Sequence, residues 1–276
     1  MRLLITGAGG GLGRAFLDVV PAHHDVVALT HAELDIGDHG AVMRTVPPLR
    51  PEAVLNLAAF TDVDGNETDP ARAFRDNAQG PQSLALAAGS CDAILLHVST
   101  DFVFDGEKDG PYDEADAPGP VNVYGRAKLA GERMVRHVHP RSFIVRTGYV
   151  FGGGDDYVSS QIERLRRGGD AAALADRTGS PTYVRHLAER LVPLVLTHRF
   201  GTYHLAGPEA ATWHQVLSRC KELGSFVGTV HPQRSIDLHR PARRPRSSTL
   251  TSVFVSNLGI EPMPPLQDAL ADLLRR

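Results

Sequence analysis

The sequence predicts an α/β fold, in which a doubly wound parallel sheet is covered by helices and followed by a smaller C-terminal lobe. In the first half, short apolar runs alternate with longer stretches of helical period, as in βαβ units. A glycine-rich segment separates the first apolar run from the first helical stretch. Beyond about Gly152, prolines interrupt the chain and the alternation becomes irregular. We therefore expect a sheet domain over residues 1–151, to which later residues can add strands, and a lobe over residues 152–276.

Five strands and several helices are expected along the chain. The strands are short runs rich in Val, Ile and Leu, as is typical of parallel strands covered on both faces, at residues 2–6, 25–29, 53–57, 94–98 and 143–146. One helix is expected directly after the glycine-rich segment, at residues 14–20. Another is predicted by apolar residues spaced three or four apart, namely Val123, Ala127, Ala130, Met134 and Val138. Asp69 and Pro70 resemble a helix cap and first turn, and a last helix is expected over residues 266–274.

The composition excludes several classes of protein. The chain has 276 residues, a net charge of -3 and no long uncharged apolar run, so neither a membrane span nor a nucleic-acid surface is expected. Cys91 and Cys220 have no CxxC neighbour, and the 13 histidines show no metal-binding spacing, so we expect no disulfide framework and no metal site. Gly7 comes too early for a secretion signal to precede it, which favours a cytoplasmic location.

The glycine-rich segment has the spacing of a dinucleotide-binding loop. It reads Gly7-Ala8-Gly9-Gly10-Gly11-Leu12-Gly13 and lies between a predicted strand and a predicted helix. Glycines allow the tight turn and the close approach of backbone to a pyrophosphate, while the helix N-terminus attracts the anion. A plain glycine-rich turn is the alternative. The strand-loop-helix context favours a Rossmann-like NAD(P)-binding domain over residues 1–151.

The end of the second strand bears on the choice of cofactor. An acidic residue there would bind the ribose hydroxyls and repel a 2′-phosphate, but this strand ends in Thr30 and His31. NADP(H) is therefore favoured, and NAD(H) remains possible. His31 either lies near the phosphate or is a solvated loop residue. Asp35 and Ile36 are expected beside the adenine ring.

A candidate catalytic group lies on the predicted helix near residue 124. Tyr124 and Lys128 are four residues apart and so share one helix face. A tyrosine needs a nearby cation to act in acid–base chemistry near neutral pH, and Lys128 would supply it. An exposed helical pair is the alternative. Thr100, at the end of the fourth strand, strengthens the catalytic interpretation because its hydroxyl can reach the same substrate oxygen.

Four further blocks make the chain resemble the dTDP-4-dehydrorhamnose reductase family of extended short-chain dehydrogenases/reductases. The resemblance covers nearly the whole chain. The blocks read Ser99-Thr100-Asp101-Phe102-Val103-Phe104-Asp105-Gly106, Asn122-Val123-Tyr124-Gly125 with Lys128-Leu129-Ala130-Gly131-Glu132, Asp176-Arg177-Thr178-Gly179-Ser180-Pro181-Thr182-Tyr183, and Arg240-Pro241-Ala242-Arg243-Arg244-Pro245.

The resemblance implies NAD(P)H-dependent reduction of the C4 ketone of dTDP-4-dehydro-L-rhamnose, or of a closely related dTDP-4-keto-6-deoxy sugar. It implies that Thr100, Tyr124 and Lys128 are catalytic. The residues expected to bind the cofactor are Gly7, Gly10, Gly11, Leu12, Thr30, Asp35, Ile36, Ala59, Phe60, Thr61, Val98, Tyr124 and Lys128. Those expected to bind the dTDP-sugar are Thr100, Asp101, Tyr149, Arg243 and Arg244, and the lobe over residues 152–276 is expected to bind mainly the substrate.

Some features leave alternatives open. Tyr149 stands where the family commonly carries Trp, and His186 stands where it usually carries Asp, so the sugar is less certain than the type of reaction. By charge alone, the arginines between 240 and 246 suit a solvated loop as well as a diphosphate site. The regulatory subunit of methionine adenosyltransferase resembles the same family, so a cofactor-binding protein without turnover is the alternative function. A homodimer is possible.

Overall fold

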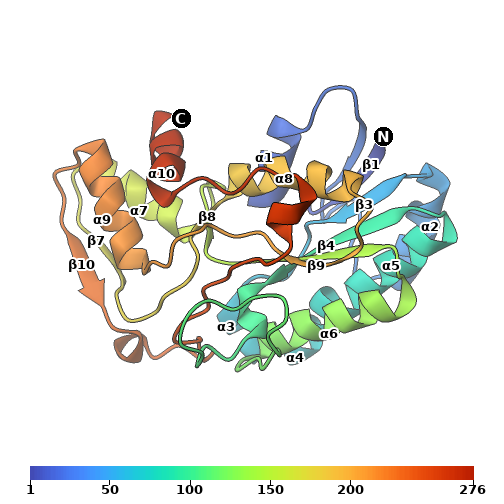
Figure 1. Cartoon of the computed structure of the whole chain (residues 1–276). Helices are drawn as coiled ribbons and strands as arrows, with labels where there is room; N and C mark the ends of the chain where they lie inside the picture. Colours follow the sequence, from blue (N-terminus) through green and yellow to red (C-terminus); the bar gives the residue numbers. More distant parts are fainter.

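A parallel sheet forms the centre of the molecule. The computed structural model describes residues 1–276. The strands of this sheet are β1 (Arg2–Thr6), β2 (Asp25–Leu29), β3 (Ala53–Asn56), β4 (Ile94–Thr100), β5 (Ser142–Thr147) and β9 (Gly201–His204). Their order is β2-β1-β3-β4-β5-β9, and every neighbouring pair is parallel (Figure 1). The predicted doubly wound α/β fold is confirmed. The direction of winding reverses between β1 and β3, where the carboxyl ends of such sheets bind ligands.

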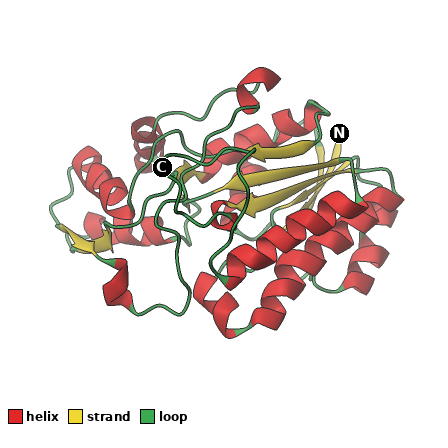
Figure 2. Cartoon of the chain, turned by 60° about the horizontal axis from the view of Figure 1, so that its bottom comes forward, coloured by secondary structure: helices red, strands yellow, loops and turns green.

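Helices cover both faces of the sheet (Figures 1 and 2). One face packs against α1 (Gly11–Val19) and α8 (Val184–Leu196), where Leu3 and Ile5 share a core with Phe16 and Leu191. The other face packs against α2 (His39–Thr45), α5 (Gly80–Ser90) and α6 (Val123–Val138). Shorter pieces complete this half: η1 (Pro47–Leu49), α3 (Val63–Thr68), α4 (Pro70–Phe74), the π-helical turn η2 (Arg75–Gln79) and η3 (Asp101–Val103). None of the helices has the length and apolar character needed to cross a membrane.

The elements expected from the sequence agree with the structure to within a few residues. β1 and β2 have the predicted bounds, whereas β3 ends one residue early and β4 continues two residues further, to Thr100. α1 begins three residues before the predicted start, so that Gly11 and Gly13 of the glycine-rich segment lie in its first turn. Asp69 caps α4 as expected, since its carboxylate accepts a hydrogen bond from the backbone N–H of Arg72 at 3.0 Å.

The second lobe, at the left of Figure 1, has a core of its own. Its elements are β6 (Val150–Phe151), α7 (Tyr157–Arg166), β7 (Ala171–Leu174), β8 (Thr182–Tyr183), α9 (Trp213–Gly224), β10 (Val230–Gln233), η4 (Ser235–Leu238) and α10 (Leu266–Arg275). Between η4 and α10 in sequence, η5 (Val255–Leu258) packs against the core of the central sheet instead. Ile162 on α7, Leu217 on α9 and Leu270 on α10 meet in this core. The lobe is therefore held together by its own apolar contacts.

The two parts of the chain are not divided cleanly at residue 151. α8 and β9 lie between elements of the lobe in sequence, yet they return to the central sheet. β9 pairs with β5, and α8 packs beside α1. The physical reason is that β5 would otherwise expose an unpaired edge and the sheet an uncovered apolar face.

Candidate active site

The glycine loop has the geometry of a phosphate cradle. Gly7 has a φ of +73°, and a Cβ there would lie 2.6 Å from the backbone nitrogen of Ala58. A Cβ at Gly13 would lie 2.3 Å from the carbonyl oxygen of Gly7, so the turn and the first turn of α1 admit only glycine. Gly10 caps α1 without a side-chain hydrogen bond, which leaves the first N–H groups of the helix available to an anion. The loop thus fits the pyrophosphate of a dinucleotide.

A cavity of about 870 Å³ lies beside this loop, at the carboxyl ends of the strands. It is lined by most of the residues expected to bind a dinucleotide, namely Gly7, Gly10, Gly11, Leu12, Asp35, Ile36, Ala59, Phe60, Thr61, Val98, Tyr124 and Lys128. Thr30 is the exception. Its backbone N–H and its hydroxyl both donate to the Glu33 carboxylate at 2.8 Å, and the neighbouring His31 lines the cavity instead. Of the two residues at this strand end that bear on the choice of cofactor, the structure brings His31 to the cavity and not Thr30.

A buried amide supports the loop that follows β3. Asn77 is fully buried in η2, where its Oδ1 accepts from the backbone N–H of Phe60 at 3.0 Å and its Nδ2 donates to the Phe60 carbonyl at 2.9 Å. Both backbone groups of Phe60 are thereby satisfied by one side chain. Asn77 holds this segment in place along the cavity wall without lining the cavity itself.

The structure brings Tyr124, Lys128, Thr100 and Asp101 to the same cavity. Asn122 caps α6 by accepting from the backbone N–H of Gly125 at 2.7 Å, which puts Tyr124 in the first turn of the helix. Lys128 follows one turn later and is 1% exposed. Its Nζ donates to the carbonyl oxygen of Val98 at 2.7 Å, so the side chain reaches under the end of β4.

Burial shifts the pKa values of three ionisable groups, in each case in the direction that favours the uncharged form of the group. It raises the pKa of Tyr124 to about 12, lowers the pKa of Lys128 to about 8 and raises the pKa of Asp101 to about 6. The cause in each case is first the loss of water around the charged form. Near neutral pH the Tyr124 phenol therefore keeps its proton, as a general acid must.

Thr100 and Asp101 are linked to the lobe by hydrogen bonds. The Thr100 hydroxyl donates to Asp101 Oδ1 at 2.9 Å and accepts from the backbone N–H of Phe102 at 3.1 Å. The Ser248 hydroxyl, from the C-terminal lobe, donates to Asp101 Oδ2. The Thr100 hydroxyl has one proton, so while it donates a hydrogen bond to an ionised Asp101 it cannot donate one to a substrate oxygen. Protonation of Asp101 at this oxygen makes the Thr100 proton available.

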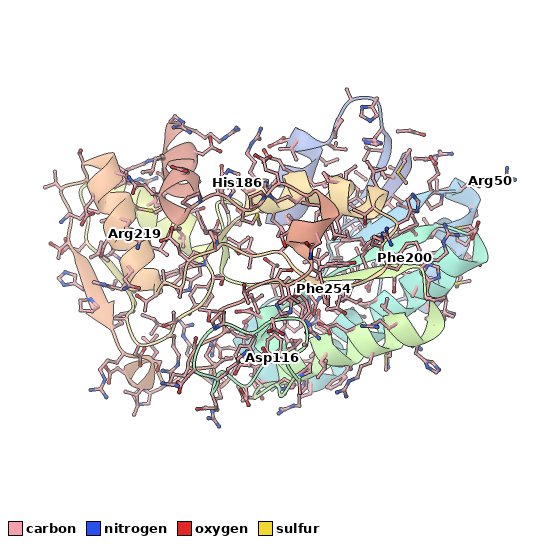
Figure 3. The ribbon with its side chains drawn as sticks, viewed as in Figure 1. Arg50, Asp116, His186, Phe200, Arg219 and Phe254 are labelled. Atoms are coloured by element: carbon pink, nitrogen blue, oxygen red, sulfur yellow. The ribbon has the colours of Figure 1, made fainter.

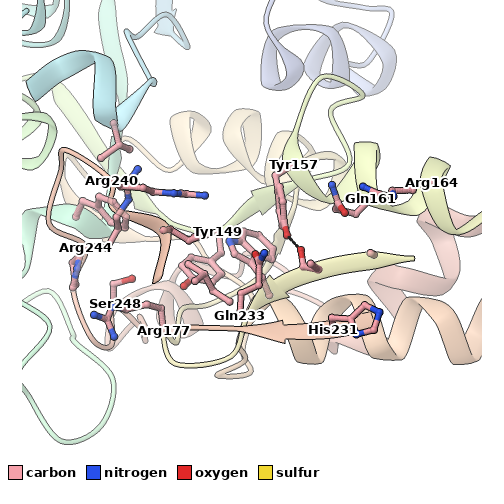
Figure 4. Close-up of a pocket in the computed structure, with 18 of the residues that line it drawn as sticks. Tyr149, Tyr157, Gln161, Arg164, Arg177, His231, Gln233, Arg240, Arg244 and Ser248 are labelled. Carbon is pink, nitrogen blue, oxygen red and sulfur yellow. Dashed lines mark hydrogen bonds between the residues drawn. The ribbon is translucent and has the colours of Figure 1, made fainter. Parts of the chain in front are cut away.

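A second cavity, of about 670 Å³, adjoins the first (Figure 4). The residues common to both linings are Val63, Phe102, Tyr149, Tyr157 and Trp213. Beyond them the second cavity is bordered by guanidinium groups, those of Arg164, Arg177, Arg240 and Arg244. Such a wall suits phosphate oxygens, because a guanidinium can bind two of them at once.

An aromatic pair stands where the two cavities meet. The rings of Tyr149 and Trp213 stack with centroids 4.3 Å apart and an angle of 17° between their planes. Tyr149 has a φ of +49°, and a Cβ on Gly179 would lie 2.3 Å from its ring, so glycine makes room for this aromatic. An indole from α9 therefore lies directly against the aromatic ring at position 149. The sequence analysis missed Trp213, although it is the single tryptophan of the chain.

The two arginines expected to bind the sugar nucleotide lie in different surroundings. Arg244 lines the second cavity and is held by a bidentate ion pair with Asp64 of α3, at 2.5 and 2.7 Å. The Arg243 side chain is 70% exposed, pairs with Glu107 at 3.3 Å and lines neither cavity. The structure therefore does not bring Arg243 to the site. His186 also lies outside it, at the start of α8 against Tyr183 (Figure 3).

Comparisons with known proteins agree with this geometry. The sequence profile of the family described as "RmlD substrate binding domain" matches residues 1–276. A dTDP-4-dehydrorhamnose reductase of Mycolicibacterium smegmatis is 40% identical over 278 residues, covering 98% of this chain and 84% of that protein. A protein of Streptomyces antibioticus, named a probable dTDP-4,6-dihydroxy-2-methyloxan-3-one 4-ketoreductase, is 36% identical and covers 99% of this chain and 94% of its own length.

Solved structures show the same relationship. The crystal structure of dTDP-4-dehydrorhamnose reductase from Bacillus anthracis, described as a complex with NADP, superposes with a TM-score of 0.95 at 31% identity. The match covers 99% of this chain and 98% of that one. The resemblance inferred from the sequence blocks is confirmed, and this chain belongs to the dTDP-4-dehydrorhamnose reductase family.

Proposed function

We propose that this chain is an NADPH-dependent reductase of the C4 ketone of a dTDP-4-keto-6-deoxy sugar, with dTDP-4-dehydro-L-rhamnose as the first candidate and dTDP-L-rhamnose as its product. The observation that carries the proposal is the half-buried, protonated Tyr124 phenol on a dinucleotide-sized cavity that adjoins an arginine-bordered one. The reductase relatives and the NADP complex of a family member support the reaction and the cofactor.

The first cavity would hold the dinucleotide, which supplies the hydride when bound. The N–H groups at the start of α1 would bind its pyrophosphate, and Asp35 and Ile36 would lie beside the adenine. Lys128 would hydrogen-bond the ribose hydroxyls. NAD(H) remains possible, because the Glu33 carboxylate beside Thr30 brings negative charge to the end of β2.

The second cavity would hold the sugar nucleotide. Arg244 and the neighbouring Arg240 and Arg177 would bind its diphosphate, because guanidinium groups pair well with phosphate oxygens. The Tyr149–Trp213 pair would form the wall against which the sugar lies, with Asp101 at the sugar end. Residues 1–151 with α8 and β9 would thus bind mainly the dinucleotide, and the remainder of 152–276 mainly the substrate.

The chemistry follows from the protons that these side chains hold. As hydride adds to C4, the C4–O double bond becomes an alkoxide, and Tyr124 would give that oxygen its phenolic proton. Thr100 would donate a hydrogen bond to the same oxygen when its proton is not held by Asp101. The tyrosinate that remains then takes up a proton before the next turnover.

The test is NADPH oxidation, followed by absorbance, with a panel of dTDP-4-keto-6-deoxy sugars that differ in configuration at C3 and C5. Turnover of dTDP-4-dehydro-L-rhamnose with formation of dTDP-L-rhamnose, identified by NMR, is the expected result. Binding of NADPH without turnover on any member of the panel would contradict the proposal and favour the regulatory alternative.

A further inference from the structure

A series of hydrogen-bonded, buried polar side chains crosses the middle of the sheet and ends at Lys128. It begins at Thr6 on β1, passes through Asn56 on β3 and His97 on β4, and ends at Lys128 on α6. Each of these side chains is at most 1% exposed. The successive distances are 2.8 Å from Thr6 Oγ1 to Asn56 Oδ1, 2.9 Å from Asn56 Nδ2 to His97 Nδ1, and 3.5 Å from His97 Nε2 to Lys128 Nζ.

One backbone N–H group, that of Ala58, sets which atoms donate and which accept along this series of hydrogen bonds. Asn56 Oδ1 accepts from the backbone N–H of Ala58 at 3.2 Å as well as from Thr6. A backbone N–H can only donate, so the amide oxygen must face it and Asn56 Nδ2 must face the imidazole. His97 Nδ1 is then the acceptor. A neutral imidazole with Nδ1 as acceptor carries its proton on Nε2, the nitrogen that faces Lys128.

The proton on His97 Nε2 favours the uncharged form of Lys128. An ammonium has no lone pair, so a charged Lys128 would set its N–H groups against the N–H of His97. An uncharged amine accepts from Nε2 and still donates to the Val98 carbonyl at 2.7 Å. Burial acts in the same direction, because it holds the pKa of His97 well below its usual value and lowers the pKa of Lys128 to about 8, so that the amine of Lys128 is partly populated near neutral pH and prevails above pH 8.

We propose that His97 is a positioning residue of the active site, which directs its Nε2 proton to Lys128 Nζ and favours the uncharged amine over the ammonium in the protein without bound dinucleotide. The catalytic meaning of this inference rests on the proposed function. Ribose hydroxyls offer oxygen acceptors to an ammonium, so binding of the dinucleotide raises the pKa of Lys128 and shifts it further towards the cation that the reaction uses.

The other ionisable groups on the elements around Lys128 are already engaged. Glu132, one turn further along α6, forms a buried bidentate pair with Arg146 of β5 and accepts from Ser99. Its charge raises the pKa of Lys128, but less than burial lowers it. Further groups are Tyr124 on α6, Asp101 beside β4, Glu67 on α3, which binds the backbone N–H of Val123, and Asp76 on η2, which pairs with Arg72 and Arg75. The other ionisable side chains of α6 are exposed, namely Arg126, Arg133, Arg136 and His137. His97 is the group that contacts Nζ directly.

The protein allows a direct spectroscopic test, because its only lysines are Lys108, Lys128 and Lys221. In a Lys108→Arg, Lys221→Arg variant labelled with ¹³C- and ¹⁵N-lysine, Lys128 alone contributes a side-chain signal. We expect an NMR titration midpoint of about 8, which rises when NADP⁺ is added. A midpoint at or above the ordinary lysine value of about 10.4 would overturn the inference.

The protonated nitrogen of His97 is measured separately. In ¹⁵N-histidine-labelled protein, His97 is assigned by comparison with His97→Gln, and we expect a neutral ring protonated at Nε2 throughout the neutral range. A ring protonated at Nδ1, or a charged ring, would overturn the inference. Neither NMR measurement depends on turnover, so failure of the proposed function and failure of this inference are distinguishable.

Two matched variants test the positioning role. The amide of His97→Gln can accept from Asn56 and still donate to Lys128, whereas the shorter amide of His97→Asn reaches only the place of Nδ1. We expect His97→Asn to raise the pKa of Lys128 by about 0.5 to 1 unit and to lower kcat by about 5- to 10-fold, with His97→Gln close to wild type. Equal behaviour of two folded variants, in pKa and in kcat, would assign His97 a packing role and overturn the inference.

Discussion

The two cavities of this molecule are built in opposite ways. At the first, Thr100, Asp101 and Lys128 are buried side chains at the end of β4 and on α6, each fixed by hydrogen bonds. At the second, the arginine side chains extend from loops and from α7, and some are half exposed. The first arrangement controls protons, because burial shifts pKa values. The second suits an anion, because the guanidinium groups of several arginines border one cavity. We therefore expect the proton chemistry at the buried, hydrogen-bonded cavity and the recognition of the substrate at the arginine-bordered one.

The largest expected effect is at the buried site. Tyr124→Phe removes the proton donor, and we expect kcat to fall by about 10³-fold while NADPH affinity changes little. The measurements are steady-state NADPH oxidation and quenching of the Trp213 fluorescence. Tyr203→Phe is the matched control, since the Tyr203 hydroxyl binds the Arg199 carbonyl at 2.6 Å and lines neither cavity. Substantial turnover by Tyr124→Phe would remove the distinction between the two cavities.

The second cavity is tested by a pair of neighbouring arginines. We expect Arg244→Ala to raise KM for the sugar nucleotide by about 10- to 100-fold, because a charge-assisted contact to phosphate is lost. Arg243→Ala serves as the control and should change KM by less than about twofold, because its side chain makes an exposed ion pair. Equal losses of affinity in both variants would show that the binding role is not set by the cavity lining.

The pH dependence of NADPH binding tests the first cavity again. Burial lowers the pKa of Lys128 to about 8, so its charged form prevails below that pH and the amine above it. Ribose oxygens are bound better by the ammonium. We therefore expect NADPH affinity to be greatest below pH 8 and to fall, by up to about tenfold per pH unit, as the pH rises through this value. Lys128→Met should abolish this dependence, and if it did not, another group would be responsible.

The smallest expected effect is at the junction of the two cavities. Trp213→Leu removes one ring of the stacked pair, and we expect KM for the sugar nucleotide to rise by about 2- to 10-fold with kcat nearly unchanged. Trp213→Phe keeps an aromatic ring and should lie closer to wild type. Calorimetry would give the affinities, since these variants lack the fluorescent indole. A loss of kcat without a change in KM would place Trp213 with the chemistry and not with recognition.

Most of the central sheet was predictable from the sequence. The five early strands are contiguous runs of apolar residues, and their positions depend on little beyond which residues need burial. β9 was not identified, because Gly201–His204 is a short run between elements of the lobe and its strand character comes from pairing with β5. Tertiary pairing, and not local propensity, makes this segment a strand.

The site was predictable to the extent that its residues lie in local motifs. The glycine loop, Thr100, Tyr124 and Lys128 all lie at strand ends or on one helix face, where spacing in the sequence fixes position in space. Thr30 does not line the cavity, and its hydroxyl and backbone N–H donate to Glu33, a pairing that the strand pattern does not reveal. Trp213 could have been noticed as a lone tryptophan, but its stacking on Tyr149 has no local signal.

Three features follow from sequence patterns alone, because each depends on the repeat of one strand or helix: the central sheet apart from β9, the glycine loop and the Tyr124–Lys128 pair. Tertiary structure decided which of two adjacent arginines faces a cavity, since Arg244 is turned inward by Asp64, 180 positions earlier, and Arg243 outward by Glu107. It also decided which nitrogen of His97 carries the proton, through Asn56 and the backbone of Ala58. The direction of a side chain depends on partners that folding brings together, and no local pattern encodes those partners.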